Sequence, residues 1–329
     1  PPVRYTFHTN VVKGLQEHGP PAYKAVIDEL LQMLKNKKAL HPVMNDELTD
    51  QQRKRVIRSL MFLKPKFDSM GRFEKIKARL VANGKQQDRN LYPDNSSPTA
   101  MMQSIFLSLA AAAEGGRKAA TMDIGGAYLN AEMTGEEVFM ELDKMLTSIL
   151  SKVAPEVVPY IDKRGRLTCK LDRAVYGCVQ SAKLWYCTIT DYLKSLGYVP
   201  NPVDPCVLNH TDPRGKQCTI VLYVDDLLVL AEDECMIGEL HSQLTERFEG
   251  VSISTDTDLS YLGMHICLKN GQVNVSMQAY LEGVLKECGT TGVVSTPATA
   301  GLFNNGDYQL LNEKESKFYP VRLEHQDYY

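Results

Sequence analysis

Two adjacent aspartates between two apolar runs constrain the fold of this chain more than any other feature. Asp225 and Asp226 separate residues 219–223 from residues 227–231, and both runs are rich in Val, Leu and Ile. Short apolar runs joined by a tight connection predict a β-hairpin. Strands disfavour Asp, and like charges at neighbouring positions repel each other. The sequence therefore predicts a hairpin with two acids at its tip and a compensating partner for their charge.

Divalent cations are the partner that this arrangement favours. Mg²⁺ prefers oxygen ligands and leaves positions open for phosphates, and two metal ions about 3.5 to 4 Å apart can activate a hydroxyl and stabilise a leaving phosphate. Asp123, at the end of a predicted strand at residues 121–124, completes a set of three carboxylates. For the Asp-Asp dipeptide alone, an exposed acidic turn is the better interpretation. With the flanking strands included, we expect Asp123, Asp225 and Asp226 to bind two Mg²⁺ ions, or Mn²⁺ in their place.

Length and composition predict a globular intracellular protein. The chain has 329 residues, 43% of them hydrophobic, which is enough for roughly two domains. Its longest apolar stretch, residues 101–113, is shorter than the roughly 20 residues needed to cross a bilayer. The eight cysteines show no zinc-type spacing, so we expect free thiols. The start lacks Met and a secretion signal, so we expect a segment of a longer polypeptide.

The net charge of −3 hides an asymmetry along the chain. Residues 1–90 hold 18 Lys or Arg against 9 Asp or Glu, a balance of +9, and the remaining residues hold a balance of −12. The first 90 residues are therefore the candidate surface for nucleic-acid phosphates. A solvated face without a function explains the asymmetry equally well.

Periodicity and turn residues place the other elements. Helical spacing predicts helices at residues 21–39, 99–114, 181–196, 237–248 and 278–286. Apolar runs predict further strands at residues 58–66, 75–82, 138–141, 167–171, 259–268 and 272–276. Thr99-Ala100 is expected to open the second helix, residues 68–71 to form the first hairpin turn, and Asn270-Gly271 to form the last one.

Five segments occur in the order typical of one enzyme family. They are Lys77-Ala78-Arg79-Leu80-Val81-Ala82-Asn83-Gly84, Asp123-Ile124-Gly125-Gly126-Ala127-Tyr128, residues 175–186, Tyr223-Val224-Asp225-Asp226, and Tyr261-Leu262-Gly263-Met264-His265-Ile266. Together they resemble the reverse transcriptases of copia-type LTR retrotransposons, over about residues 48–297. In residues 175–186, Val179 stands where the family usually has Lys and Ala182 where it usually has Pro.

The resemblance implies an α+β right-hand polymerase. Residues 1–120 would form the fingers and the first part of the palm. Residues 121–276 would form the palm, with an antiparallel sheet and a fingers insertion around residues 136–180. Residues 277–329 would form the start of the thumb and a tail. Only about thirty residues follow Pro297, too few for an RNase H domain, so we expect polymerisation without template degradation.

The resemblance also assigns substrate contacts. Arg79, with Lys77 nearby, would bind the incoming triphosphate through forked hydrogen bonds. The Ile124 carbonyl would bind metal together with Asp123. Tyr128 would exclude a ribose 2′-hydroxyl; the alternative is that Tyr128 is an ordinary core residue. Tyr176, Gly177 and Gln180 would also contact the nucleotide, with these contacts weakened by the departures at Val179 and Ala182.

A hairpin near the end of the resemblance would hold the primer. Tyr223, Leu262, Gly263 and Met264 would contact the primer, and His265 is either a phosphate contact or an ordinary surface residue. Trp185, the only tryptophan, is expected in the core of its helix.

The implied function is RNA-directed and DNA-directed DNA polymerisation. Its partners would be an RNA template, a DNA primer–template duplex and dNTPs, with no membrane, in the cytoplasm or in virus-like particles. One alternative is a domesticated scaffold that binds nucleic acid without synthesis. Another is an RNA-dependent RNA polymerase, for which a small or polar residue would be expected where Tyr128 stands.

Overall fold

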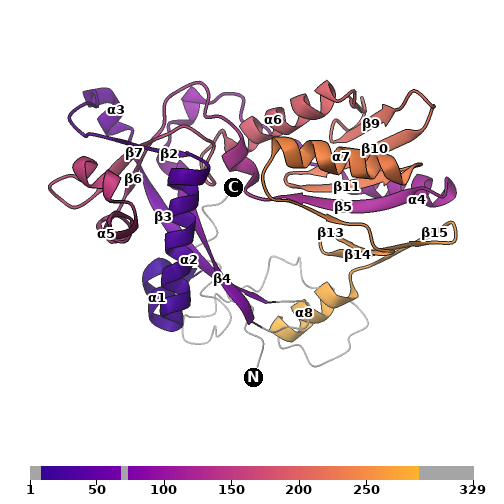
Figure 1. Cartoon of the computed structure of the whole chain (residues 1–329), viewed down its shortest axis with the longest axis horizontal. Coiled ribbons are helices and arrows are strands. Elements are labelled where there is room, and N and C mark those ends of the chain that lie inside the picture. Colours follow the sequence, from indigo (N-terminus) through magenta and orange to yellow (C-terminus); the bar gives the residue numbers. More distant parts are fainter. Residues whose placement is uncertain (1–8, 68–72, 289–329) are drawn as a thin grey trace, which may run out of the picture. The chain divides into compact units, whose positions relative to one another are not determined.

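The computed structural model in Figure 1 describes residues 9–67 and 73–288. The chain divides into two compact units, Pro1–Leu281 and Glu282–Tyr329. The first unit holds three sheets and almost all of the described helices. The predicted turn at residues 68–71, and the predicted tail beyond Cys288, lie outside the described residues.

The first sheet is built from residues far apart in the sequence. Its strands lie in the order β1-β3-β6-β7-β2, with β4 paired to β3. Their bounds are β1 Thr9–Asn10, β2 Leu40–Val43, β3 Ile57–Phe67, β4 Phe73–Ala82, β6 Phe139–Leu142 and β7 Leu167–Leu171. Among the described pairings of this sheet only β3 with β6 is parallel.

Helices cover the first sheet with apolar faces. Four α-helices belong to this part: α1 Val11–His18, α2 Pro20–Leu31, α3 Asp50–Lys54 and α5 Lys144–Val153. In Figure 1, α2 runs beside β3 and β4, and it buries Ala22, Val26 and Leu30 in a core shared with both strands. Helix α2 continues as a π-helical turn, Gln32–Asn36. The helix predicted over residues 21–39 is therefore confirmed in position but changes type near its end and stops before β2.

The central sheet is antiparallel throughout its described pairings and carries the aspartates. Its order is β12-β5-β11-β10-β9-β8. The bounds are β5 Lys118–Ile124, β8 Val199–Pro200, β9 Val207–Thr211, β10 Gln217–Tyr223, β11 Asp226–Ala231 and β12 Val251–Ser254. Apolar runs on β10 and β11 are buried on both faces, because helices lie on both sides of the sheet.

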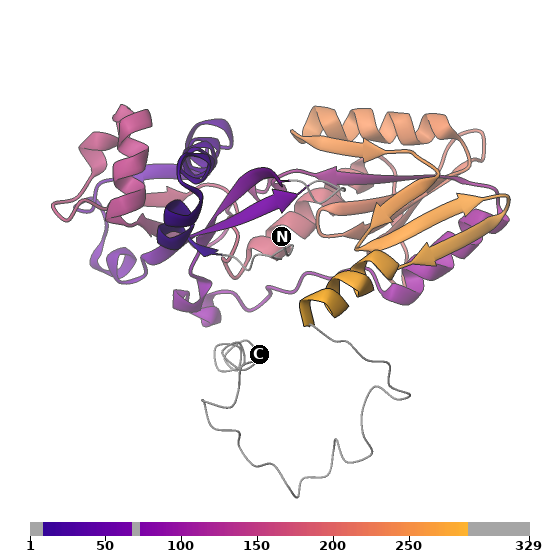
Figure 2. The ribbon, with the colours of Figure 1, turned by 90° about the horizontal axis from the view of Figure 1, so that it is seen from below.

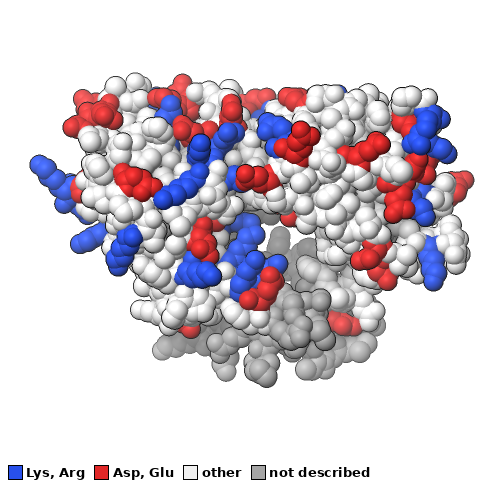
Figure 3. Space-filling model, viewed as in Figure 1, with Lys and Arg blue, Asp and Glu red and all other residues white. Residues whose placement is uncertain are grey.

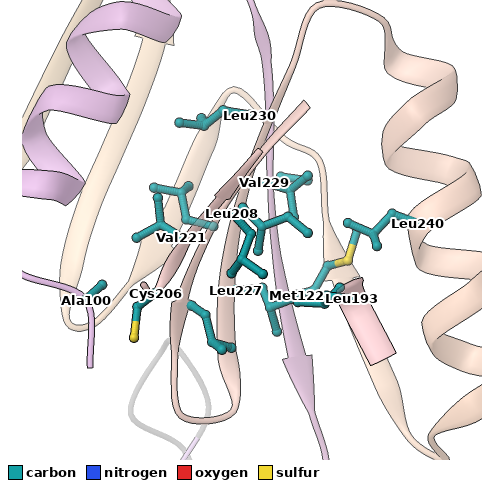
Figure 4. Packing of buried hydrophobic residues seen from close by; sticks show 14 of the residues in the cluster. Ala100, Met122, Leu193, Cys206, Leu208, Val221, Leu227, Val229, Leu230 and Leu240 are labelled. Carbon is teal, nitrogen blue, oxygen red and sulfur yellow. The ribbon is translucent and has the colours of Figure 1, made fainter. Parts of the chain in front are cut away.

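Three helices complete the core of the central sheet. They are α4 Met102–Glu114, α6 Ser181–Ser195 and α7 Glu234–Arg247. Figure 2 shows α7 on one side of the sheet and α4 on the other. Figure 4 shows Met122 of β5 close to Leu193 of α6 and Leu240 of α7 in this core.

A small sheet follows the central one. It has the order β13-β14-β15, with bounds Asp258–Tyr261, Met264–Lys269 and Gln272–Ser276. The single strand predicted at residues 259–268 is wrong, because the chain turns at Leu262 and Gly263, whose φ angles are 50° and 77°. Helix α8, Gln278–Cys288, follows β15 and runs across the boundary between the two units.

The start of α4 also differs from the prediction. Thr99-Ala100 does not open this helix; the residue before the helix is Met101, whose N–H donates to the buried Asp204 carboxylate at 2.9 Å. A distant carboxylate thus takes the place of a local cap. Helix α7 begins at Glu234, earlier than predicted, because the Asp233 side chain accepts a hydrogen bond from the Cys235 N–H.

The predicted mixture of helices and antiparallel strands is confirmed, and other general properties of the described residues accompany it. Mixed α and β structure with mainly antiparallel sheets agrees with the predicted α+β class. The seven cysteines with described side chains are free. None of the helices in the described residues combines the length and apolar character needed to cross a membrane. On the face seen in Figure 3, Lys and Arg side chains are interspersed with Asp and Glu.

Candidate active site

The predicted hairpin forms, and its tip is held from two sides. Tyr223 pairs with Asp226, so Val224 and Asp225 alone make the connection between β10 and β11. The Val224 carbonyl accepts a hydrogen bond from the Trp185 indole N–H at 2.7 Å. The Asp225 carbonyl accepts one from the Ile124 N–H at 3.0 Å. Both peptide carbonyls of the connection are therefore fixed by groups outside the hairpin.

Strand pairing brings Asp123 to the same end of the sheet. Asp226 is the Cα partner of Asp123 across β11 and β5. Residues directly opposite each other in an antiparallel pair present their side chains to the same face. Asp225 lies next to this pair, through its carbonyl contact with the β5 end. The structure thus gathers the three aspartates that the sequence singled out.

Burial and the charges of neighbouring aspartates perturb Asp226 and Asp123. Burial, followed by the charges of Asp225 and Asp123, raises the pKa of Asp226 to about 6. Burial and the Asp225 charge also raise the pKa of Asp123, and Lys77 partly offsets this shift. A cation placed among these groups would favour their ionised forms.

The donor set fits a hard cation. As their side chains stand, no three Asp, Glu, His or Cys residues in the described part of the chain are close enough together to hold a metal ion. The three acids nevertheless supply only carboxylate oxygens, the ligands that Mg²⁺ prefers, and the raised pKa values of Asp123 and Asp226 come from burial and then from the charges of neighbouring aspartates. The residues present therefore suit Mg²⁺ or Mn²⁺ in the kind of ligand that they supply.

Residues from three separate segments form an aromatic and basic cluster beside the acids. The Arg79 guanidinium lies over the Tyr176 ring, 4.2 Å from its centroid. The Tyr176 and Tyr128 rings are 4.5 Å apart, tilted by 56°. Burial, and then the charge of Asp225, raises the pKa of Tyr128. Lys77 lies on β4 with Arg79, close enough to lower the pKa of Asp123. Four residues that the resemblance assigned to the nucleotide are thus near the acids.

The turn before α6 is fastened to β4 by its backbone. The Ala82 N–H donates to the Tyr176 carbonyl at 2.7 Å. Gly177 has a φ of +89°, and a Cβ there would lie 2.1 Å from the Ala82 carbonyl oxygen. Only glycine satisfies both conditions, because the approach is to backbone atoms that cannot rotate away. Gly177 thus supports Tyr176 and, through it, Arg79.

Gln180 has a different environment from the one expected. Its side chain is 6% exposed. It accepts a hydrogen bond from Gln87 Nε2 at 3.1 Å and donates to Met133 Sδ at 3.2 Å. Gln87 also accepts from the Val179 N–H at 2.8 Å. The structure therefore places Gln180 in the interior, where it helps to hold the turn.

The residues predicted to hold the primer differ in exposure: Gly263 is exposed, Tyr223 and Leu262 are half-buried, and Met264 is buried. Tyr223 sits next to the acids, opposite Asp226. Leu262 and Gly263 form the left-handed turn between β13 and β14, and Met264 is 1% exposed. This turn is tied to the central sheet, because the Tyr261 hydroxyl donates to the Val221 carbonyl at 3.0 Å.

His265 and Trp185 have local roles. His265 Nε2 lies 3.7 Å from Asp258 on the exposed face of β14, an ion pair when the ring is protonated. Trp185 is 1% exposed, which confirms its predicted place in the helix core. Its bond to Val224 was not predicted, since periodicity shows only which face of a helix is apolar.

Sequence reasoning missed Glu29. Its carboxylate accepts a hydrogen bond from the Leu80 N–H at 2.9 Å, on the edge of β4 that faces α2. Burial raises the pKa of Glu29, while the Leu80 N–H and the charges of Arg79 and Lys77 act against that rise. The carboxylate therefore fixes the strand segment that carries Arg79. No local pattern distinguishes it from the neighbouring Asp28.

Comparisons with known proteins point to one family. The family model described as reverse transcriptase (RNA-dependent DNA polymerase) matches residues 48–300. The chain is 28% identical over 254 residues to the retrovirus-related Pol polyprotein from transposon TNT 1-94 of Nicotiana tabacum, covering 76% of this chain and 18% of that protein.

Transposon proteins of two other organisms are also similar to this chain. The retrovirus-related Pol polyprotein from transposon RE1 of Arabidopsis thaliana is 28% identical over 238 residues, covering 71% of this chain and 15% of that protein. The transposon Ty1-H Gag-Pol polyprotein of Saccharomyces cerevisiae is 26% identical over 277 residues, covering 80% of this chain and 14% of that protein. The chain thus spans less than a fifth of the length of these relatives, whose names confirm the predicted resemblance to retrotransposon enzymes. The family model matches most of this chain, which shows that the chain belongs to the reverse transcriptase family.

Proposed function

We propose that the chain is an RNA-directed and DNA-directed DNA polymerase that transfers nucleotides from dNTPs to a primer 3′-hydroxyl. One observation carries the proposal: Asp123, Asp225 and Asp226 meet at one end of the central sheet, where strand pairing brings together acids that repel one another. Membership of the reverse transcriptase family supports a polymerase in general. A fold without chemistry gains nothing from three mutually repelling carboxylates.

Asp123, Asp225 and Asp226 would bind two Mg²⁺ ions. When bound, these ions would lower the pKa of the 3′-hydroxyl and neutralise charge on the phosphates. The 3′-oxygen forms a bond to the α-phosphorus, the bond to pyrophosphate breaks, and the hydroxyl proton is released. Asp123, on β5, and Asp225, in the connection between β10 and β11, would hold the ligand oxygens in place. The Ile124 N–H assists by fixing the Asp225 carbonyl.

The aromatic and basic cluster would select the nucleotide. Arg79 can make forked hydrogen bonds to triphosphate oxygens, and Lys77 adds charge on the same strand. Tyr128 packs against Tyr176, so its ring is held in one place and can exclude a 2′-hydroxyl from the sugar site. Gly177 would let the backbone lie close to the substrate, as it already does to Ala82.

The same proposal assigns a role to each part of the architecture. The first sheet would be the fingers, with residues 136–180 supplying part of it. The central sheet would be the palm, the turn at Leu262 and Gly263 would hold the primer with Tyr223 and Met264, and α8 would begin the thumb. Template RNA and the primer–template duplex would be the partners. We also propose an intracellular site of action, in the cytoplasm or in virus-like particles, which the similarity to transposon polyproteins supports.

Primer extension tests the proposal. The protein is incubated with dNTPs and a primed RNA or DNA template, with and without Mg²⁺, and compared with Asp225→Asn. We expect metal-dependent extension that Asp225→Asn abolishes. The matched control is Asp50→Asn, whose carboxylate is 94% exposed and 3.8 Å from Arg53, and which should extend normally.

The same assay separates the alternatives. Nucleic-acid binding without extension by the wild type would replace the proposal with a scaffold. Extension from rNTPs as readily as from dNTPs would indicate an RNA polymerase. Unchanged extension by Asp225→Asn would remove the metal assignment.

A further inference from the structure

The connection that carries Asp225 has a strained backbone. Val224 has a φ of 57°, in the left-handed region, although it is a β-branched residue. Branching at Cβ makes this conformation unfavourable, and such residues keep it only when their surroundings impose it. The surroundings of Val224 should therefore contain the group that holds it.

That group is the Trp185 side chain. Its indole N–H reaches the Val224 carbonyl at 2.7 Å. Trp185 is 1% exposed, and its ring packs edge-on against Phe248, with centroids 5.4 Å apart and planes at 72°. Phe248 is equally buried. The indole N–H can only donate a hydrogen bond. If the Val224 carbonyl turned away, the N–H would lose its partner, or the ring would have to leave this packing.

The second carbonyl of the connection is held from the other side. The Ile124 N–H donates to the Asp225 carbonyl, and Ile124 is fully buried at the end of β5. With Tyr223 and Asp226 paired, the first contact fixes the Val224–Asp225 peptide and the second fixes the Asp225–Asp226 peptide, so that both peptides flanking Asp225 are held. Peptide orientation sets the direction in which the Asp225 carboxylate leaves the backbone.

We propose that Trp185 is a positioning residue that holds the Val224–Asp225 peptide in its left-handed conformation and so directs the Asp225 carboxylate to the metal site. The inference rests on the proposed function and deepens it. It gives the only tryptophan of the chain a role that a core residue does not have. Trp185 acts through Asp225 and does not itself contact substrate.

The variant Trp185→Phe removes the N–H and keeps an aromatic ring. We expect kcat to fall by about tenfold, a change equivalent to roughly 1.4 kcal/mol in the barrier. The KM for dNTP should stay within about twofold, because the cluster around Arg79 is untouched. The Mg²⁺ concentration for half-maximal rate should rise, since the carboxylate is no longer held in its direction.

Tyr192→Phe is the matched control. Tyr192 lies on the same helix, its ring packs against the same Phe248 at 5.5 Å, and its hydroxyl donates to the Gln243 carbonyl at 2.7 Å. This variant also loses one hydrogen bond from an aromatic side chain of α6. We expect it to lower thermal stability while kcat and the Mg²⁺ dependence remain those of the wild type. Equal losses of activity in both variants would reduce Trp185 to a packing residue.

Val224→Gly provides a rescue. Glycine adopts a positive φ without strain, so the peptide no longer needs the indole to hold it. Adding Val224→Gly to Trp185→Phe should restore much of the lost kcat, and should stabilise the fold more in that background than in the wild type. No rescue, or an equal stability change in both backgrounds, would overturn the inference. The stability measurement does not depend on activity.

Tryptophan emission gives a test without any variant of Trp185. The chain has one tryptophan, so its fluorescence reports on this residue alone. Titration with Mg²⁺ or Mn²⁺ in the absence of nucleic acid should change the emission of the wild type and leave that of Asp225→Asn unchanged. No change in the wild type would overturn the coupling. If the wild type shows the change but extends no primer, the proposed function fails and the positioning role of Trp185 stands.

Discussion

Replacement of Gly177 by Ala should destabilise the fold and impair nucleotide use together. The residue has a φ of +89°, and the new Cβ would lie 2.1 Å from the Ala82 carbonyl oxygen and 2.7 Å from Val81 Cγ1. A left-handed conformation costs an alanine about 1 to 2 kcal/mol. Relief of the clash requires the turn and β4 to separate, an overpacking cost of about 1 to 3 kcal/mol.

Separation would also lengthen the hydrogen bond from the Ala82 N–H to the Tyr176 carbonyl, now 2.7 Å. A net loss of about 1 kcal/mol is typical for such a bond. The expected decrease in the free energy of unfolding is therefore roughly 3 to 6 kcal/mol. Because Tyr176 supports Arg79, the KM for dNTP should rise as well.

Gly135→Ala is the matched control. Gly135 has a φ of +85°, and no atom lies within 4 Å of a Cβ added there. This variant has the conformational cost without the clash, so it should lose only about 1 to 2 kcal/mol. Thermal unfolding would show the difference as a gap of roughly 5 to 10 °C between the two melting temperatures. Equal melting temperatures and equal nucleotide KM values would refute the reasoning.

Three further substitutions test the site. Tyr128→Val should raise ribonucleotide incorporation relative to dNTP by more than about tenfold, because a steric clash is removed; an unchanged ratio with both activities lost would mark Tyr128 as a core residue. Arg79→Ala should lower kcat/KM for dNTP by about 1.5 to 3 kcal/mol, with template affinity nearly unchanged in a binding assay. The pKa of Asp226 is raised to about 6, so the folded state binds this proton more tightly and metal-free stability should fall as pH rises from about 4 to 6. Asp226→Asn should weaken that dependence, and at pH 8 its free energy of unfolding in urea should exceed that of the wild type by roughly 1 kcal/mol, a gain limited by solvent screening. If wild type and variant lost stability equally as the pH rose, the repulsion would be contradicted.

Local sequence made the hairpin that carries Asp225 and Asp226 predictable. Two apolar runs around Asp225 and Asp226 permit few structures other than a hairpin, and β10 and β11 form where expected. The strand of Asp123 was also predicted, from its own short apolar run. Periodicity could not predict that Asp123 lies beside Asp226, because the pairing of β5 with β11 joins residues about a hundred positions apart.

Contacts between distant segments account for the features that were missed. The burial of Glu29 depends on β4 passing next to α2, and the same helical pattern would equally suit an exposed carboxylate. The break between β13 and β14 was missed because the apolar alternation continues through Leu262, while the turn depends on two left-handed residues. Strands of two residues, such as β1 and β8, exist only because a longer neighbour offers its edge.

The strands of the first and central sheets alternate along the sequence, and this order has a consequence for synthesis on the ribosome. Strand β2 finds its partner β7 only when residues 167–171 have emerged, because Leu40 pairs with Leu171. Until then, β2 and β6 each have an edge without the partner β7. Strand β5 is already synthesised, but it pairs with β11 only after residues 226–231 have emerged. Nascent chains therefore carry unpaired apolar strands over more than a hundred residues of translation. We expect folding yield in cells to depend on chaperones that cover these edges until residue 231 is made.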